Sequence, residues 1–484
     1  MIHINWKPDK SNKIPVYKQI IAFIKENIER GEWPVGTTLP SQRSFAVAFG
    51  VNRSTVTYAI EELIALGILE GNSRIGTKVI NNTWNLLSSS VQPDWNFYIQ
   101  SGIHLPNQTL IQKINISEFI PKIIKLGTGE LAPELFPREM INQIVCNLPE
   151  KMKSFSSEEP KGLYYLRKMI SNYVKGFGVD VSPSSILIVS GSLQALHLIS
   201  LGLMKKGSDV FVENPSYLYS LNVFQSLGMK LHGLPMDDQG VLTDTLSNYT
   251  NKNGSLLYTV PTFHNPTGTL MTTERRKELI DTCQKNQIPI IEDDAYHELW
   301  FECPPPLPLK SMDKSGHVLY IGSTSKILGS GFRVGWVIGP EPVIERLADI
   351  KMQTDYGTNT LAQWITAESI SSGFYGKHLD ELRKNLKERR NRTLEILKEY
   401  FSDLATWQTP AGGYYIWLRL NAPIQMKHLF DRALNENVLI NPGSLYSPSI
   451  NNSLRISYAY ATLSEIHEGL YLLSDIIKKL PKKK

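Results

Sequence analysis

The stretch Val318-Leu319-Tyr320-Ile321-Gly322-Ser323-Thr324-Ser325-Lys326 decides the fold class of the larger part of this 484-residue chain. It is a short apolar run followed by a tight polar loop that ends on a lysine. Apolar runs followed by polar loops, without the lysine, recur at residues 186–189, 210–212, 256–260 and 288–291. Helical patterns at 192–204 and 272–285 separate some of these runs. The alternation predicts an α/β fold with a mainly parallel sheet flanked by helices, in which ligands bind beyond the carboxyl ends of the strands.

The composition is typical of a globular protein with a sizeable core, with 42% apolar and 20% charged residues. It excludes disordered, collagen-like and coiled-coil chains, and the length predicts about three structural units. The three cysteines, Cys146, Cys283 and Cys303, are too few and too scattered for a disulfide framework or a clustered zinc site, and we expect no metal. Neither a secretory signal pattern nor an apolar run of about 18 residues is present, so we expect a cytoplasmic protein that does not span a membrane.

The excess positive charge is concentrated near the start of the chain. The net charge is +5, and residues 1–80 hold ten Lys/Arg against seven Asp/Glu. No acidic residue lies between Ser41 and Ile60. The asymmetry is mild, so by itself it gives only weak support for a nucleic-acid partner.

The first eighty residues have the pattern of three helices and a hairpin. Pro15 opens an amphipathic helix that Gly31 ends, and Ser41 and Asn52 are placed to cap two further short helices. Residues 68–80 predict a β-hairpin. Two short helices joined by a tight turn suit the major groove of DNA. Periodicity alone leaves a small helical domain with an incidental polar face equally open.

The landmarks of this segment are Pro15-x-Tyr17-x-x-Ile20, Pro34-x-Gly36-x-x-Leu39-Pro40-Ser41-x-Arg43, Val51-Asn52-Arg53-x-Thr55-Val56 and Gly76-Thr77-x-Val79. In this order they resemble the GntR-type winged helix–turn–helix, an α+β DNA-binding domain. The resemblance implies that the last of the three helices reads operator DNA and that the hairpin is the wing. It implies phosphate or base contacts from Arg43, Arg53, Ser54, Thr55 and Thr57, and from Arg74 at the tip of the wing.

Residues 81–111 have the composition of a linker. They contain no Lys or Arg and one acid, Asp94. Four aromatic residues, Trp84, Trp95, Phe97 and Tyr98, would not normally be left in water, so we expect part of the linker to dock on a domain surface. The expected organisation is a DNA-binding domain at 1–80, a partly docked linker at 81–111 and a large domain at 112–484, with a smaller C-terminal α+β lobe from about residue 380.

The loops after the predicted strands hold the groups that pyridoxal 5'-phosphate (PLP) needs. Taken singly, Lys326 could be a surface lysine, Asp294 a helix cap and Tyr217 a core residue. Together they provide a lysine for a Schiff base with the aldehyde and a carboxylate that keeps the pyridine nitrogen protonated. The expected catalytic residues are Lys326, Asp294 and Tyr296. The other expected contacts are Asn265 and Tyr296 to the phenolate oxygen, Tyr217 to the ring, and Gly191, Ser192, Ser323, Ser325 and Arg333 to the phosphate.

Ordered landmarks span residues 120–475, among them Ser190-Gly191-Ser192-Leu193-Gln194-Ala195-Leu196, Asn214-Pro215-x-Tyr217, Asn265-Pro266-Thr267-Gly268, Asp294-x-Tyr296, Ser323-x-Ser325-Lys326, Phe332-Arg333-x-Gly335, Pro410-x-Gly412-Gly413 and Leu454-Arg455-Ile456. This set resembles the fold-type I aminotransferases. The resemblance implies that Arg455 receives a substrate carboxylate, for which a guanidinium is well shaped. One departure lies at 155–160, where many of these enzymes place a Tyr that reaches the phosphate of the neighbouring subunit and this chain has no clear match.

A GntR-type reader joined to an aminotransferase-like domain resembles the MocR family of bacterial transcriptional regulators. The resemblance implies a homodimer, commonly head-to-tail, whose two readers bind spaced half-sites on double-stranded DNA. The leading hypothesis is a regulator in which a small amino compound, expected to have a carboxylate, exchanges with Lys326 and so changes DNA affinity. Two alternatives stay open: an active aminotransferase with an accessory DNA-binding domain, and a regulator that senses PLP itself. Some Schiff-base or half-transamination chemistry is expected, whereas full turnover does not follow from the sequence.

Overall fold

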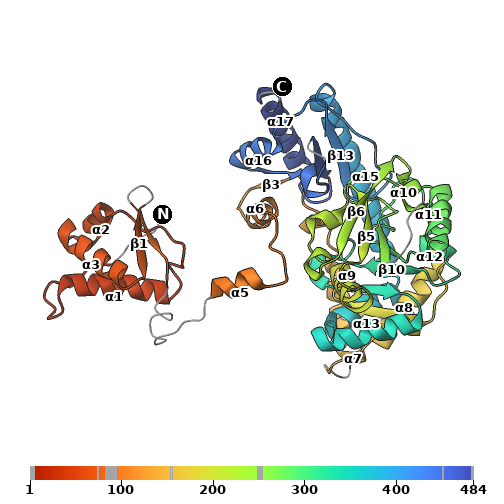
Figure 1. The fold of residues 1–484 in the computed structure, drawn as a ribbon, viewed down its shortest axis with the longest axis horizontal. Coiled ribbons are helices and arrows are strands. Elements are labelled where there is room, and N and C mark those ends of the chain that lie inside the picture. Colours follow the sequence, from red (N-terminus) through yellow and green to blue (C-terminus); the bar gives the residue numbers. More distant parts are fainter. Residues whose placement is uncertain are drawn as a thin grey trace. The chain divides into compact units, whose positions relative to one another are not determined.

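The computed structural model describes residues 6–72, 76–81, 95–152, 154, 156–247, 254–449 and 452–480. The chain divides into two compact units, Met1–Gly102 and Ile103–Lys484 (Figure 1), and each has its own hydrophobic core. Among the described residues, no helix is long and apolar enough to cross a membrane.

The first unit is a winged helix–turn–helix. Its elements are α1 (Val16–Glu29), α2 (Gln42–Phe49), α3 (Arg53–Ala65) and the antiparallel strands β1 (Leu69–Asn72) and β2 (Gly76–Val79). Helical spacing places Ile20, Ile24 and Ile28 on one face of α1, where they are buried together with Phe45 of α2 and Val56 of α3. The predicted helices and hairpin are confirmed, with ends that differ by one or two residues.

The ends of these helices follow from local chemistry. Ser41 Oγ accepts a hydrogen bond from the backbone N–H of Ser44 at 3.1 Å and so caps α2. Gly50 ends α2 in the left-handed region at φ +64°, a conformation that would strain a residue with a side chain. Asn52 occupies the N-cap position of α3, but its side chain makes no capping bond, so the predicted cap is wrong. Pro15 is the N-cap of α1 and not its first helical residue.

The linker contains a helix, α5 (Trp95–Ser101), whose aromatic side chains we expected to be packed. In this structure they are exposed, by 66% for Trp95, 63% for Phe97 and 58% for Tyr98. Trp84 lies outside the described residues, and the docking of these aromatic residues stays a prediction. Further along, the backbone N–H of Leu105 donates to Ser226 Oγ at 3.1 Å, so the end of the predicted linker contacts the second unit.

The second unit is built on an eight-stranded sheet in the order β4-β11-β10-β9-β8-β5-β6-β7. The strands β5, β6, β8, β9 and β10 pair in parallel, while β7 and β11 pair antiparallel with their neighbours. Every residue of β4, β8, β9 and β10 is buried, as expected for strands covered on both faces. The predicted mainly parallel sheet is confirmed. The strand bounds are β4 (Ile186–Val189), β5 (Asp209–Asn214), β6 (Lys230–Asp237), β7 (Gly240–Val241), β8 (Ser255–Thr259), β9 (Ile290–Asp293), β10 (Val318–Ser323) and β11 (Gly335–Ile338).

Helices flank this sheet, with α11 and α12 on one side of the view in Figure 1. The helices of the second unit are α6 (Thr109–Ser117), α7 (Arg138–Lys151), α8 (Tyr164–Val174), α9 (Ser192–Leu203), α10 (Asp244–Ser247), α11 (Thr273–Lys285), α12 (Leu309–Met312), α13 (Glu341–Thr354), α14 (Thr360–Ser371), α15 (Phe374–Phe401), α16 (Met426–Asn435) and α17 (Leu463–Lys479). The short 3-10 turns are η1 (Pro133–Leu135), η2 (Lys175–Phe177), η3 (Pro183–Ser185), η4 (Tyr217–Ser220), η5 (Gln225–Leu227), η6 (Ser330–Phe332) and η7 (Gly443–Leu445).

The C-terminal lobe contains a four-stranded antiparallel sheet in the order β12-β13-β16-β15. Its strands are β12 (Ala405–Thr406), β13 (Tyr415–Leu420), β15 (Asn441–Pro442) and β16 (Ser453–Ser457). A segment from the start of the unit joins this region, because β3 (Ile124–Lys125) pairs in parallel with β14 (Val438–Leu439). The residues just after β3 are thereby brought to the side of the lobe that faces the large sheet.

Candidate functional site

A cavity of about 440 Å³ lies at the carboxyl ends of β8, β9 and β10. Its walls are the loops after these strands, the first turn of α9, and the lobe strands β13 and β16. Eight of the predicted cofactor and substrate residues line it: Ser192, Tyr217, Asn265, Tyr296, Ser325, Lys326, Arg333 and Arg455. The fold therefore gathers, at one point, residues from almost the whole length of the second unit.

Lys326 lies in the loop after β10 with its amine in the cavity. Its Nζ donates a hydrogen bond to the Gly129 carbonyl oxygen at 2.6 Å. The Tyr414 hydroxyl donates to the backbone carbonyl oxygen of Lys326 itself and so holds the loop in place. Gly129 comes from the segment after β3, so the pairing of β3 with the lobe positions a partner for the amine.

A cradle for an anion lies at the N-terminus of α9. Gly191 precedes the helix at φ +90°, and a Cβ on it would lie only 2.6 Å from a guanidinium nitrogen of Arg333. Arg333 Nη2 donates to the Ser190 carbonyl oxygen at 2.8 Å, and Ser323 Oγ donates to Ser325 Oγ at 3.0 Å. Helix N-terminal amides, hydroxyls and a cation are the groups that bind phosphate in proteins. Gly191 and Ser323, the remaining predicted phosphate residues, are thus in contact with residues that line the cavity.

Asp293, and not the predicted Asp294, lines the cavity. Asp293 is the last residue of β9, and the Tyr258 hydroxyl donates to its Oδ2 at 2.8 Å. The carboxylate of Asp294 lies outside the lining, with Oδ2 at 2.9 Å from Nδ1 of His297. Successive residues of an extended strand point to opposite faces, so adjacent acids cannot both face the cavity. The placement of Asp294 in the cofactor site is therefore corrected to Asp293.

The two carboxyl groups also differ in their acidity. Burial raises the pKa of Asp293 to about 6, against the opposing effect of the hydrogen bond from Tyr258. Burial acts in the same direction on Asp294, but the contact with His297 outweighs it and holds the pKa of Asp294 below its ordinary value. Asp294 thus has its counter-charge within the fold, whereas Asp293 faces the space that a ligand would fill.

Arg455, on β16, is a buried cation in the wall of the cavity that the C-terminal lobe provides. Its Nη1 donates to Asn265 Oδ1 at 2.9 Å and its Nη2 donates to the Gly127 carbonyl oxygen at 2.6 Å. The guanidinium carbon lies 4.3 Å from the ring centre of Tyr415 and 4.9 Å from that of Tyr446. Its Nε has no hydrogen-bond partner in the described chain. The side chain is therefore held firmly but retains an unused donor.

Three tyrosines that were not predicted from the sequence line this cavity, Tyr258, Tyr415 and Tyr446. The Tyr415 hydroxyl lies 3.1 Å from the hydroxyl of the predicted Tyr296, and Tyr258 contacts Asp293. Burial raises the pKa of Tyr296 well above its ordinary value. A signal was present, since Tyr414 and Tyr415 follow Pro410-x-Gly412-Gly413, but the sequence did not show which of the two faces inward.

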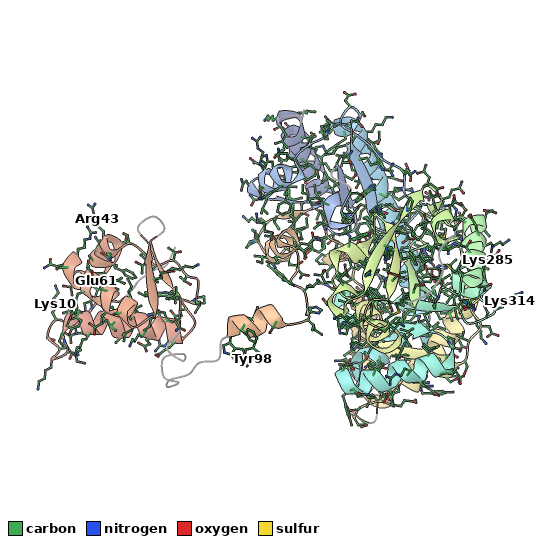
Figure 2. The ribbon with its side chains drawn as sticks, viewed as in Figure 1. Lys10, Arg43, Glu61, Tyr98, Lys285 and Lys314 are labelled. Atoms are coloured by element: carbon green, nitrogen blue, oxygen red, sulfur yellow. The ribbon has the colours of Figure 1, made fainter. Side chains whose placement is uncertain are left out.

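The predicted DNA contacts lie on two helices of the first unit. Arg43 of α2 and the first residues of α3, Arg53 and Ser54, are exposed, and Figure 2 shows the Arg43 side chain extending outward. Thr55 borders a surface hollow together with Arg43 and with Lys10, a cation that the sequence analysis did not single out. Thr57 differs, because its hydroxyl donates to Gln42 Oε1 at 2.9 Å and links the two helices. Arg74 lies outside the described residues.

Two parts of the chain match known families. Residues 121–471 match Aminotransferase class I and II, and residues 16–79 match the Bacterial regulatory proteins, gntR family. The chain belongs to both families. It is a MocR-type transcriptional regulator, in which a GntR reader precedes an aminotransferase-like domain.

Relatives of this MocR-type regulator share both parts. The HTH-type transcriptional regulators YdfD and YisV of Bacillus subtilis (strain 168) are each 50% identical to it, over 97% and 98% of this chain and 98% of each relative. HTH-type transcriptional regulator NorG of Staphylococcus aureus (strain N315) is 33% identical over 91% of this chain and 100% of its own length. A solved kynurenine aminotransferase of Pyrococcus horikoshii has a TM-score of 0.75 and 32% identity, over 80% of this chain and 98% of its own.

The site of the MocR-type regulator fits pyridoxal phosphate. The Pyrococcus structure holds PMP, the amino form of this cofactor. In the present chain, the amine of Lys326, the carboxylate of Asp293 and the anion cradle beside Arg333 provide one suitable group for each part of the cofactor. The missing Cβ at Gly191 leaves the cradle open for a phosphate. Pyridoxal phosphate is the cofactor expected in this domain.

Proposed function

We propose that this regulator binds operator DNA and senses a small amino compound with a carboxylate group through covalent exchange at Lys326. The observation that supports it most is the Arg455 guanidinium, which lines the same cavity as the Lys326 amine and whose Nε has no hydrogen-bond partner among the described residues. An amino acid or a related compound has one group for each of these two residues.

The surroundings of Arg455 favour a carboxylate ligand. A buried cation is costly unless it is paired, and Arg455 is only 6% exposed. Its partners within the described chain are neutral oxygens and aromatic rings, with no carboxylate in ion-pairing distance. A planar guanidinium suits bidentate pairing with a carboxylate. PLP alone would not place a carboxylate against Arg455, so the presence of this buried cation in the cavity favours an amino compound with a carboxylate as the signal.

When bound, the cofactor supplies an aldehyde carbon that forms a covalent bond to a primary amine. Lys326 provides the resident amine, and Asp293 takes the part that we expected of Asp294, as the carboxylate opposite a protonated ring nitrogen. Asn265 and Tyr296 donate hydrogen bonds to the ring oxygen, and Tyr217 packs against the ring. Gly191, Ser192, Ser323, Ser325 and Arg333 hold the phosphate.

For the DNA-binding part, we assign contacts to the exposed Arg43, Arg53 and Ser54 and to Thr55, and we keep Arg74 of the wing as a proposed contact. Thr57 orients the recognition helix through Gln42 in place of a direct contact. A head-to-tail homodimer would place two readers on spaced half-sites. The site of action is the cytoplasm, where operator DNA lies.

The experiment that tests this function is a visible absorbance titration of the purified, PLP-loaded protein with primary amines. The wild type is expected to show the band of a Schiff base, and an amino acid is expected to change it at lower concentrations than an amine without a carboxylate. Lys326→Ala is expected to lack the band. The same spectrum in wild type and Lys326→Ala would refute the assignment of Lys326.

The alternative function is that of an active aminotransferase, and the 32% identity to the kynurenine aminotransferase together with the nearly complete cofactor set favours it. Steady turnover of an amino acid with a keto acid, unaffected by operator DNA, would support the alternative. A single round of amine exchange without turnover would support the sensor.

A further inference from the structure

Tyr415 places a phenol at the point where Lys326, Tyr296 and Arg455 meet. It is the first residue of β13 and is 1% exposed. Its hydroxyl lies 3.1 Å from the Tyr296 hydroxyl, and the Arg455 guanidinium stacks against its ring. The Tyr415 side chain therefore lies beside the Arg455 guanidinium, which we propose binds the ligand carboxylate, and beside the Tyr296 hydroxyl.

Gly129 keeps the space beside this phenol free. A Cβ on Gly129 would lie 2.3 Å from the Tyr415 hydroxyl oxygen and 3.8 Å from Lys326 Nζ. The Tyr415 hydroxyl and the Lys326 amine thus lie next to the same space, which a side chain at position 129 would occupy. Gly129 is not in the left-handed region, so it is the space and not the backbone conformation that calls for glycine here.

The charges around Tyr415 favour its ionised form. Burial opposes ionisation, but the cations of Arg455 and Lys326 and a hydrogen bond from Tyr296 outweigh burial and lower the pKa of the Tyr415 hydroxyl. Burial raises the pKa of Tyr296, which therefore keeps its proton. The other titratable groups that interact with Tyr415 are Glu130, whose charge opposes its ionisation, and the phenols of Tyr217, Tyr414, Tyr446 and Tyr458.

We propose that Tyr415 is the proton carrier for the exchange of amines at Lys326, an inference that rests on the proposed function. An amino compound arrives as an ammonium ion and must lose a proton before its nitrogen can attack. It would give that proton to the Tyr415 phenolate, and its nitrogen would form a bond to the cofactor carbon that Lys326 holds. A second proton would pass directly from the incoming nitrogen to Lys326 Nζ, the bond from the carbon to Nζ would break, and the released lysine amine would take the first proton from the Tyr415 hydroxyl. The phenolate is restored, and no proton is gained or lost overall.

The first test titrates the tyrosines of the cofactor-free, full-length protein by their near-ultraviolet tyrosinate absorbance. The wild type is expected to contain one phenol that ionises before the others, and Tyr415→Phe is expected to lack it. Tyr458→Phe is the matched control, because Tyr458 is also a buried phenol of the lobe but donates to the Gly413 carbonyl oxygen outside the cavity. The early step should persist in Tyr458→Phe. An early step that also persists in Tyr415→Phe would overturn the proposal.

The second test follows the visible absorbance of the PLP-loaded protein after rapid mixing with L-alanine over a range of pH. Tyr415→Phe is expected to keep its Schiff-base band but to exchange more slowly than wild type, on the order of 100-fold, with a changed pH profile. Gly129→Ala, which keeps the phenol but displaces it, is expected to be slowed as well. Overlapping pH profiles of wild type and Tyr415→Phe would overturn the proton-carrier role alone. A wild type without a band would overturn the proposed function, and this inference with it.

Discussion

Two neighbouring buried carboxyl groups, Asp293 and Asp294, differ in pKa because burial raises both values but only Asp294 has a strong enough set of partners to lower its own. Asp294 has the imidazole of His297 at 2.9 Å, whereas the described residues offer Asp293 one hydroxyl as a side-chain partner. Burial accordingly raises the pKa of Asp293 to about 6, while that of Asp294 is lowered. A positively charged ring nitrogen beside Asp293 would provide the missing partner and return its pKa towards the ordinary range.

In the cofactor-free protein, Asp293 is expected to destabilise the second unit as the pH rises. Its folded-state pKa of about 6 lies above the ordinary 3.8, so folding favours its protonated form. The resulting stability is fully present below the unfolded pKa and is lost as the pH rises through about 6. The loss is on the order of 3 kcal/mol. Chemical unfolding of wild type and Asp293→Asn over this pH range measures it as a widening difference.

Asp294→Asn is the matched control for this experiment, because the pKa of Asp294 is lowered. Its stabilising contribution is present above the unfolded pKa and is lost as the pH falls, which gives a difference of the opposite sign. Parallel stability curves for wild type and Asp293→Asn would contradict the assignment of Asp293 as the carboxyl group without a counter-charge.

The sequence predicted site residues that follow an apolar run, but it did not decide between two adjacent residues of the same type, such as Asp293 and Asp294. Lys326 and Asn265 were predicted because their motifs follow apolar runs, and Arg455 was predicted from the resemblance to aminotransferases; all three line the cavity. The choice between Asp293 and Asp294 was wrong because it depends on which residue is the last one of β9, and the sequence does not show where the strand ends. Tyr415 was missed because its partners come from distant segments that only the folded chain brings together.

The elements that read DNA depend on a few backbone positions between the helices. The turn from α2 to α3 contains the left-handed Gly50, while Ser41 caps the other end of α2. The hydrogen bond from Thr57 to Gln42 ties the two helices together at their facing sides. The recognition helix is therefore presented at an angle that the domain core, and not the DNA, determines.

Gly50→Ala is expected to lower the stability of the first unit. Alanine at φ +64° is strained, at a cost of about 1 kcal/mol. Thermal unfolding of the full-length protein, followed by a probe in the first unit such as Trp33 fluorescence, measures the effect. The transition of the second unit should not move, and an unchanged first transition would show that this turn adapts without strain.

Arg53→Ala is expected to weaken operator binding and to reduce the slope of log affinity against log salt by about 1, because we propose that the exposed Arg53 neutralises one phosphate. Thr57→Val is the control from the same helix, and it should act through stability without changing the slope, since its hydroxyl bonds to Gln42. Equal slopes for wild type and Arg53→Ala, measured by titrating operator at several salt concentrations, would remove Arg53 from the phosphate contacts.

The long elements of the chain were predictable and the short connections were not. The five predicted strands and the helices between them matched their sequence patterns. For β5, β8, β9 and β10 the reason is that a central parallel strand is covered on both faces and must be apolar on both. The pairing of β3 with β14 was not predicted, since two-residue strands leave no periodicity to read. The exposure of Trp95 on α5 was also not predicted, because aromatic content indicates packing without indicating the partner.

At the scale of the whole molecule, the protein joins a site for a small ligand to a site for DNA. Binding at one can influence the other only if the ligand binds more tightly to one of two states of the protein. The coupling is reciprocal, so operator DNA must change ligand affinity by the same factor. We propose that the two units of this polypeptide are coupled in this way. Lys326→Ala should then uncouple them, because it removes the amine in the second unit and leaves the DNA-binding domain unchanged.

The most direct measurement is therefore the operator affinity of the PLP-loaded, full-length protein at one fixed salt concentration, with and without a saturating amino acid. The wild type is expected to change its affinity by a factor of about 5 or more. Lys326→Ala is expected to bind operator with an affinity that the amino acid does not alter. Equal affinities of the wild type in both conditions, while its absorbance shows that the amine has reacted, would contradict the account.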